Sequence, residues 1–444
     1  MKRFLILMMM VLLTFSVFAE GQAEEEKPII FAIVNDYPAA KVHDADFEGW
    51  LYKDRIVAPF TAATGIEVTI RKYTDATDNT AKSLDMDLAS GDSSDVILSY
   101  GGRVNKFANA DFGVNLYEAL PQEFIDQFAP SALKQFERNG ELFTLPMPGW
   151  ATCMMVNVDL FEEAGVTDIL PADDDPDRSW TIAEFDRAVK AVTALGDEYY
   201  GYYLIAKECG GDYWIMNMLG GFGAKLYEDG KVALNCPAGI EGMEYIHYLH
   251  ENGYVPYGAS GLFDGDMASL YFTGKLGTRG YVPMGADAGE ISFKDGKNDK
   301  PFKSILMEYP HIEGVVDGVP PCYGPDATMV IDNGDPVRLA KALKFIEWLA
   351  GADSQSVIAK SFAKFSPLTT VITEREPGPI GTAKAQMAQI IKGRGIYDMG
   401  VGFPVYNELR QIWLAVFQGM LTNAITPKEA VEEFERRGNK LLSE

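Results

Sequence analysis

The sequence has few of the residues on which cross-links and metal centres depend. It contains four cysteines, at positions 153, 209, 236 and 322, and four histidines among its 444 residues. The cysteine spacing is too irregular for a zinc ribbon or a redox pair. In an oxidising compartment Cys209 and Cys236 could form a disulfide, and the alternative is four free thiols.

Common catalytic motifs are also missing. There is no G-x-S-x-G elbow, no P-loop and no H-E-x-x-H motif in the chain. His247 and His250 lie three residues apart on an expected helix without a third ligand near them, so we interpret them as structural. The acidic run 173–177 is interpreted as a solvated loop, with a calcium site as the alternative. These patterns predict no enzyme, metal or cofactor.

Positive charge is scarce relative to negative charge. The chain has 39 Lys and Arg against 64 Asp and Glu, a formal net charge of −25. Such a charge disfavours nucleic acid and anionic membrane surfaces as partners. Beyond the first residues, no stretch approaches the ~20 apolar residues of a membrane-spanning helix.

The first residues have the pattern of a secretory signal peptide. Lys2 and Arg3 precede an apolar run from Phe4 to Leu13, and small residues near Ala19 suit a cleavage site. We predict a signal peptide over 1–19, whose removal takes the charge from −25 to −27 because Lys2 and Arg3 are lost. No cysteine lies near the cleavage site, which favours a free periplasmic protein over a lipid-anchored one. About 425 residues remain, enough for two domains.

Apolar runs and helix signals alternate along the mature chain. Residues 28–34, 68–72 and 95–99 have the composition of buried strands, and helical patterns over 49–64 and 80–89 separate them. This order predicts an α/β fold with mostly parallel sheets flanked by helices. Two later helices are predicted to begin at Asp335 and Thr426, each of which is followed by proline.

The most informative segment runs from Gly140 to Ala188. Strands are predicted over 141–147 and 154–158, with a break at the prolines between them, and Asp159 is a predicted helix N-cap. A second helix begins with Thr181 and Glu184 in a capping box, and with Trp180 and Phe185 as a hydrophobic staple.

This order of elements resembles the extracellular solute-binding proteins of family 1, the maltose-binding-like receptors of ABC importers. The strand ending in Asn-x-Asp-Leu-Phe and the Trp-Thr-x-x-Glu-Phe helix start carry the resemblance. The passages 90–97 (SGDSSDVI) and 272–281 (FTGKLGTRGY) are also similar to the family. The resemblance spans essentially the whole mature chain.

The resemblance implies a two-lobed periplasmic binding protein fold of type II, with a ligand cleft between the lobes. Lobe 1 is expected over 28–147 and 308–351, and lobe 2 over 148–307 and 352–444. The crossings between lobes are expected near Pro146 to Trp150 and near Met307 to Pro310.

Candidate ligand-binding residues lie at predicted strand ends and hinges. Aromatic faces pack on sugar rings while polar groups bind hydroxyls, and ligands of open α/β sheets lie beyond the carboxyl ends of the strands. Tyr213, Phe403 and Tyr406 are weaker candidates than Trp150, Trp214 and Tyr281, and of these three only Phe403 is selected. The selected residues are Asp36, Tyr37, Tyr100, Gly101, Trp150, Trp214, Arg279, Tyr281 and Phe403.

These observations predict a monomeric periplasmic receptor that closes on a sugar or oligosaccharide and delivers it to the membrane subunits of an ABC permease. One alternative is a receptor for another solute, such as a phosphorylated polyol, a sugar acid or a polyamine. Another is a secreted glycosidase, which needs two carboxylates about 5 to 9.5 Å apart.

Arg279 distinguishes the leading prediction from the anionic alternative. If its guanidinium binds a carboxylate or phosphate with two hydrogen bonds, Arg279→Lys loses the paired geometry but keeps the charge. Calorimetry should then show a much larger loss of affinity for a uronate or sugar phosphate than for the neutral sugar. Tight binding of neutral sugar that the substitution leaves unchanged would remove the anionic alternative.

Overall fold

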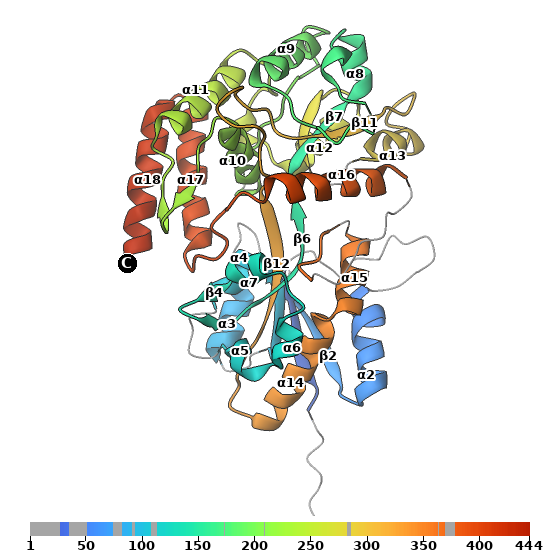
Figure 1. The fold of residues 1–444 in the computed structure, drawn as a ribbon, viewed down its shortest axis with the longest axis vertical. Coiled ribbons are helices and arrows are strands. Elements are labelled where there is room, and N and C mark those ends of the chain that lie inside the picture. The colour runs from blue at the N-terminus through green and yellow to red at the C-terminus, as the bar shows by residue number, and fades with distance from the viewer. Residues whose placement is uncertain are drawn as a thin grey trace, which may run out of the picture.

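A computed structural model describes residues 27–34, 51–73, 82–90, 94–107, 113–172, 174–207, 209–281, 286–362, 364–368 and 378–444, with Tyr281 described by its backbone alone. The chain forms two lobes, one above the other in Figure 1, as the resemblance predicted. No helix among these residues is long and apolar enough to cross a membrane.

The first lobe is built on a five-stranded sheet. Its strands are β1 (Ile29–Val34), β2 (Val68–Tyr73), β3 (Val96–Tyr100), β6 (Leu145–Ala151) and β12 (Tyr323–Val330). They are ordered β2-β1-β3-β12-β6. Nearly every side chain of β1 is buried, as its unbroken apolar sequence predicts for a central strand.

Short helices and a two-stranded ribbon surround this sheet (Figure 1). They are η1 (Leu51–Val57), α2 (Ala58–Thr64), α3 (Lys82–Ser90), α4 (Gly101–Asn105), α5 (Leu116–Ala119), α6 (Gln122–Ile125), α7 (Pro130–Lys134), β4 (Glu137–Arg138), β5 (Glu141–Leu142), α14 (Pro336–Leu349) and α15 (Ala352–Ser361).

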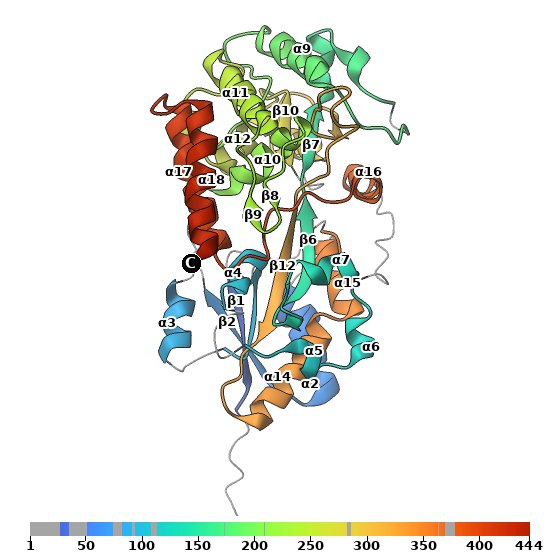
Figure 2. The same ribbon diagram turned by 60° about the vertical axis from the view of Figure 1, so that its left-hand side comes forward.

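The second lobe has a smaller sheet and longer helices. Its strands are β7 (Cys153–Asn157), β10 (Thr278–Tyr281) and β11 (Ser304–Met307), in the order β10-β7-β11, and the ribbon of β8 (Tyr227–Glu228) and β9 (Lys231–Val232). Its helices are α8 (Val158–Glu163), η2 (Thr167–Ile169), α9 (Ile182–Thr193), η3 (Cys209–Gly211), α10 (Asp212–Gly221), α11 (Pro237–Glu251), η4 (Ala259–Gly261), α12 (Asp264–Phe272), α13 (Ala288–Lys294), α16 (Gly378–Arg394), α17 (Tyr406–Leu421) and α18 (Pro427–Ser443). Figure 2 shows α17 and α18 side by side, with the C-terminus near the level of the junction between the lobes.

The predicted α/β class is confirmed, but the prediction of mostly parallel sheets is wrong. Pairing is parallel between β1 and β2 and between β1 and β3. The strands β3, β12 and β6 pair antiparallel, as do the three strands of the second sheet. The error has a physical cause: β12 returns to the first sheet from the second lobe, whereas β3 and β6 run toward that lobe, so β12 is antiparallel to both of them.

Two paired strands, β6 and β12, connect the lobes (Figure 1). The predicted crossing over Pro146 to Trp150 falls within β6. The one predicted over Met307 to Pro310 is wrong, because the backbone of Glu308 bonds to Arg178 within the second lobe. The second crossing is made by β12. A bridge between Cys322 and Tyr397 places a further segment beside it.

Contacts of the chain after residue 351 favour a later boundary for the first lobe than the predicted one. Helix α15 contacts η1 and β6 of the first lobe, and Phe365 forms a bridge with Gly149 of β6. We therefore propose that the first lobe includes the chain as far as Leu368.

Local helix signals gave mixed results. The capping box at Thr181 and the helix starts at Asp335 and Thr426 are confirmed, and Thr426 also forms a capping box with Glu429. Asp159 was wrongly predicted as an N-cap: Asn157 accepts the bond from the backbone of Leu160. The staple contact is present, since the rings of Trp180 and Phe185 are 5.3 Å apart. All four cysteines are free, so the Cys209–Cys236 disulfide is not formed.

A buried ion pair lies next to the crossing strands. The carboxylate of Asp326 on β12 accepts a hydrogen bond from the ammonium group of Lys364, and both side chains are about 4% exposed. We expect Lys364→Met to lower the free energy of unfolding by about 3–5 kcal/mol, because it leaves a buried carboxylate without its cation. Adding Asp326→Asn should recover most of this loss. Urea denaturation measures the free energy of unfolding of the single and the double variant.

The matched control is Lys225→Met, which removes the exposed pair with Glu228 on the second lobe. Exposed pairs contribute about 0–1 kcal/mol, so little change is expected. Equal losses for Lys364→Met and Lys225→Met would contradict this account of the buried pair.

Candidate functional site

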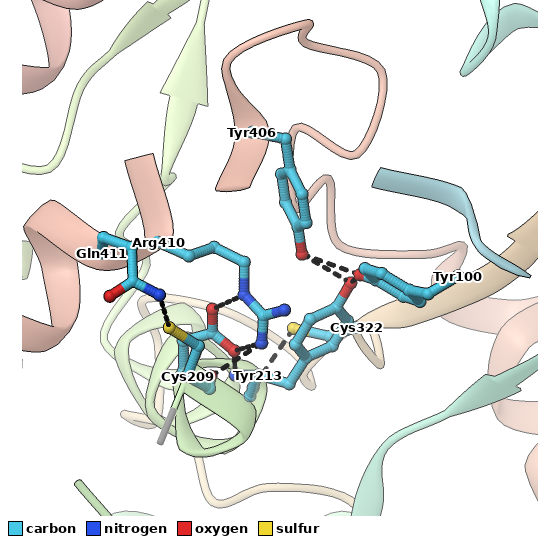
Figure 3. A network of polar contacts seen from close by, with 8 residues as sticks. Tyr100, Cys209, Tyr213, Cys322, Tyr406, Arg410 and Gln411 are labelled. Atoms are coloured by element: carbon cyan, nitrogen blue, oxygen red, sulfur yellow. Dashed lines mark hydrogen bonds and ion pairs between the residues drawn. The ribbon is translucent and has the colours of Figure 1, made fainter. Parts of the chain in front are cut away.

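Three tyrosines from separate parts of the chain meet where the lobes join (Figure 3). Tyr100 ends β3 of the first lobe, Tyr213 lies in α10, and Tyr406 begins α17. The Tyr406 hydroxyl is 2.7 Å from that of Tyr100 and 2.9 Å from that of Tyr213, and the Tyr100 and Tyr213 hydroxyls are also bonded. We call these residues the tyrosine cluster. Its hydroxyls form a polar contact between the lobes.

A charged pair supports the tyrosine cluster from the second lobe. Arg410 lies one turn after Tyr406 on α17, and its Nη2 atom is 2.8 Å from the carboxylate of Asp212 and 2.7 Å from the carbonyl oxygen of Cys209. Its Nε atom donates to the other Asp212 oxygen. The guanidinium carbon is 5.4–5.8 Å from the ring centres of the three tyrosines. Arg410 is thus held by two hydrogen bonds to one carboxylate and by aromatic faces.

Burial keeps the tyrosine hydroxyls protonated. Loss of solvation raises the pKa of Tyr100 to about 12, against the ordinary value of 10.0, although Arg410 lowers it. Burial also raises the pKa values of Tyr213 and Tyr406 well above their ordinary range. Neutral phenols both donate and accept hydrogen bonds, so the tyrosine cluster is able to exchange its internal bonds for bonds to the hydroxyls of a ligand.

Trp150 lies beside the tyrosine cluster. It is half-buried on β6, and its ring centre is 4.6 Å from that of Tyr213. A Cβ atom at Gly324 of β12 would lie 2.7 Å from the Trp150 indole, so glycine is needed for the ring to lie on this strand. The structure therefore brings Trp150 and Tyr100 together among the predicted residues.

Trp214 and Arg279 form a different group in the second lobe. The Trp214 ring packs edge-on to Tyr203 at 5.2 Å and covers Gly280 of β10. Its buried indole nitrogen has no hydrogen-bond partner within the described residues. Arg279 is 1% exposed and donates to Asp264 at 2.8 Å. Its guanidinium thus has an internal carboxylate, which is the arrangement expected of a structural arginine.

The other predicted residues have mixed positions. Gly101 begins α4, where a Cβ atom would lie 2.9 Å from the ring of Phe136. Phe403 packs edge-on to Tyr227 at 4.9 Å. Asp36 and Tyr37 lie outside the described residues, as does the side chain of Tyr281.

Asp212 and Arg410 were missed by sequence analysis. Tyr406 and Arg410 are four residues apart on a helix, so they share a face, and this spacing was a usable signal. No comparable signal connected Asp212 to Arg410, because they are brought together by the packing of α10 against α17.

The structure gives no support to a metal site at His247 and His250 or to a calcium site in the acidic run 173–177. Within the described residues there is no group of three side chains suited to hold a metal ion. His247 contacts Asn423 and His250 contacts Glu251. The carboxylates of Asp175 and Asp177 accept bonds from the backbone of their own loop.

Comparisons with known proteins agree with the geometry. Residues 45–356 match the family described as bacterial extracellular solute-binding protein. A binding protein of Brucella abortus (strain 2308) is 26% identical over 195 residues, and this match covers 44% of the present chain and 45% of the relative. The chain thus spans less than half the length of that relative.

Solved structures show the same fold over nearly the whole chain. One is an ABC substrate-binding protein from Listeria monocytogenes in complex with cycloalternan, with a TM-score of 0.73 and 14% identity, covering 94% of this chain and 99% of that one. Another is a maltose-bound protein from T. maritima, with a TM-score of 0.71 and 18% identity, covering 93% and 99%. At these identities the likeness establishes the fold alone.

The protonated tyrosine cluster predicts an alkaline loss of stability. Above pH 10 the unfolded chain releases tyrosine protons, whereas the raised pKa of about 12 lets Tyr100 keep its proton, and burial also raises the pKa values of Tyr213 and Tyr406. Stability is therefore full below pH 10 and falls as the pH rises further, by about 1.4 kcal/mol per pH unit for each such tyrosine. Urea denaturation from pH 7 to 11 measures this fall.

The variant Tyr213→Phe removes one titrating group and should make the slope above pH 10 shallower by about that amount. The variant also loses hydrogen bonds, so its stability at pH 7 differs, but the two slopes between pH 7 and 8 should agree. An unchanged alkaline slope would contradict a neutral Tyr213.

Proposed function

This chain belongs to the bacterial extracellular solute-binding proteins, and from that premise we propose that it captures a sugar or oligosaccharide for import. It is a solute-binding component of an ABC transporter, and its family implies a periplasmic or extracellular location. The proposal concerns two points: the chemical class of the solute and the residues that contact it.

The tyrosine cluster is the observation that carries this proposal. It joins hydroxyls from both lobes at the point where β3 and β6 meet the second lobe. Sugars present hydroxyls at their edges and C–H groups on their faces, and they are bound by hydroxyl donors next to aromatic rings. Tyr406 and Trp150 provide both kinds of group.

The neighbouring structures favour the same class of solute. The Listeria monocytogenes protein is described in complex with cycloalternan and the T. maritima protein with maltose, and we extend this class to the present chain as part of the proposal. Arg279 gives no support to an anionic solute, since Asp264 already satisfies its charge.

Lobe closure would couple binding to transport. The crossing strands β6 and β12 are the natural hinge, and ligand contacts from both lobes would stabilise the closed form. We propose that a monomer of this form docks on the permease after residues 1–19 are removed as a signal peptide. The proposed activity is binding without catalysis, so oligosaccharides should be recovered intact after long incubation.

Replacing Trp150 tests the location of the solute site. A thermal-shift screen of mono- and oligosaccharides would first identify a ligand, since ligand at a hundred times its dissociation constant adds about 2.7 kcal/mol of stability. Calorimetry should then show that Trp150→Ala weakens binding by about 1–3 kcal/mol, because the ring face is lost. The control is Tyr257→Ala, which removes a ring that is 97% exposed.

Small-angle scattering with the same ligand tests lobe closure. A smaller radius of gyration at saturation is expected for the wild-type protein. Equal affinities for Trp150→Ala and Tyr257→Ala would place the solute elsewhere, and an unchanged radius would argue against closure.

A further inference from the structure

A groove with a volume of about 450 Å³ is lined by residues of both lobes and by no member of the tyrosine cluster. The lining comes from α7 and β4 of the first lobe, from Tyr323 of β12 and from residues 396–403 of the second lobe. The lining residues are Ser131, Lys134, Gln135, Glu137, Arg138, Tyr323, Ile396, Tyr397, Asp398, Met399, Gly400, Gly402 and Phe403. We call this the Arg138 groove.

Arg138 is the unusual residue of this groove. Its Nε and Nη2 atoms are buried and have no hydrogen-bond partner among the residues that the structure describes. Burial lowers the pKa of Arg138, and no charged neighbour in that part of the chain opposes the shift. An arginine stays protonated in proteins, so the groove holds a partly desolvated cation with two unused donors.

The carboxylates of the groove do not fill this role. Glu137 accepts a hydrogen bond from the Tyr117 hydroxyl at 3.1 Å, and Asp398 accepts one from the backbone of Gly400 at 2.8 Å. Both acids are therefore engaged elsewhere in the walls. Buried donors without partners destabilise a folded protein, so their presence in a groove points to a group from outside the chain.

Arg410 shows what an internally satisfied arginine looks like. Its Nε and Nη2 atoms both donate to the carboxylate of Asp212, with Nη2 at 2.8 Å. Arg138 is placed in an open groove and has no such acid within the described residues. This contrast separates Arg138 from an arginine that serves only the fold.

We propose that the Arg138 groove binds a small monocarboxylate, whose two oxygens accept from the Nε–H and Nη2–H groups of Arg138. These two donors lie on one edge of the guanidinium and match the spacing of carboxylate oxygens. Apolar surface from Tyr397, Phe403 and Met399 accommodates the body of the ligand. Glu137 and Asp398 repel a second negative charge, so phosphate is disfavoured. No member of the tyrosine cluster lines this groove, so the site does not depend on the proposed sugar-binding function.

Nuclear magnetic resonance of arginine side chains tests the proposal directly. The Nε–H signal of Arg138 is assigned by its loss in Arg138→Lys. Titration with acetate and then benzoate, at constant ionic strength, should shift this signal in a saturable way, with benzoate binding more tightly because of the apolar walls. Inorganic phosphate should give no saturable shift. Equal responses to phosphate and acetate would overturn the choice of a carboxylate, and no response to either carboxylate would overturn the site.

Thermal unfolding without added carboxylate gives an independent test. Arg138→Met should raise the melting temperature, because it removes a desolvated cation that has no partner. The matched control Arg279→Met should lower it, because Asp264 then loses its cation. A fall for Arg138→Met comparable to that for Arg279→Met would make Arg138 a structural residue and would overturn the proposal.

The failure of this proposal is distinguishable from that of the sugar-binding proposal. Arg138→Gln should abolish the benzoate-dependent rise in melting temperature while leaving the affinity for a neutral sugar unchanged. Parallel loss of both would show that Arg138 acts on the solute site, contrary to the separate site proposed here.

Discussion

The antiparallel pairing of β6 with β12 is the constraint on which the rest of this structure depends. These two strands belong to the first sheet and also carry the chain between the lobes. Their register places Gly324 opposite Trp150, where the missing side chain leaves room for the indole. The pairing of β12 with β3 also places Asp326 opposite Tyr100 of the tyrosine cluster. The proposed hinge and the proposed solute site therefore share the same pair of strands.

The buried hydroxyls of the tyrosine cluster each have a hydrogen-bond partner from a distant segment. The tyrosine hydroxyls bond to one another across the lobes, and Asp212 neutralises Arg410 beneath them. Such contacts are strong where water is excluded, yet a ligand hydroxyl can replace any of the phenol partners. The proposed binding of a polar solute would use this exchange of hydrogen-bond partners.

Three arginines illustrate how surroundings decide the role of one side chain. Arg279 and Arg410 each face a carboxylate of the same lobe, so their charges are balanced inside the protein. Arg138 lies in a groove with two unused donors and with acids that are already bonded. Sequence analysis selected Arg279 because it lies in the motif 272–281. The sequence does not show that the carboxylate of Asp264 contacts Arg279 in the folded protein.

The sequence by itself determined the fold class, the local helix starts and the family resemblance. Capping at Thr181 and Thr426 depends on residues three apart, and the strand over 29–34 depends on its own apolar run, so neighbouring residues suffice. Tertiary structure decided the strand directions, the second crossing and the composition of the junction. Tyr213 and Tyr406 lie 113 and 306 positions after Tyr100 in the sequence. Their meeting depends on how the two lobes pack, and no local pattern encodes that.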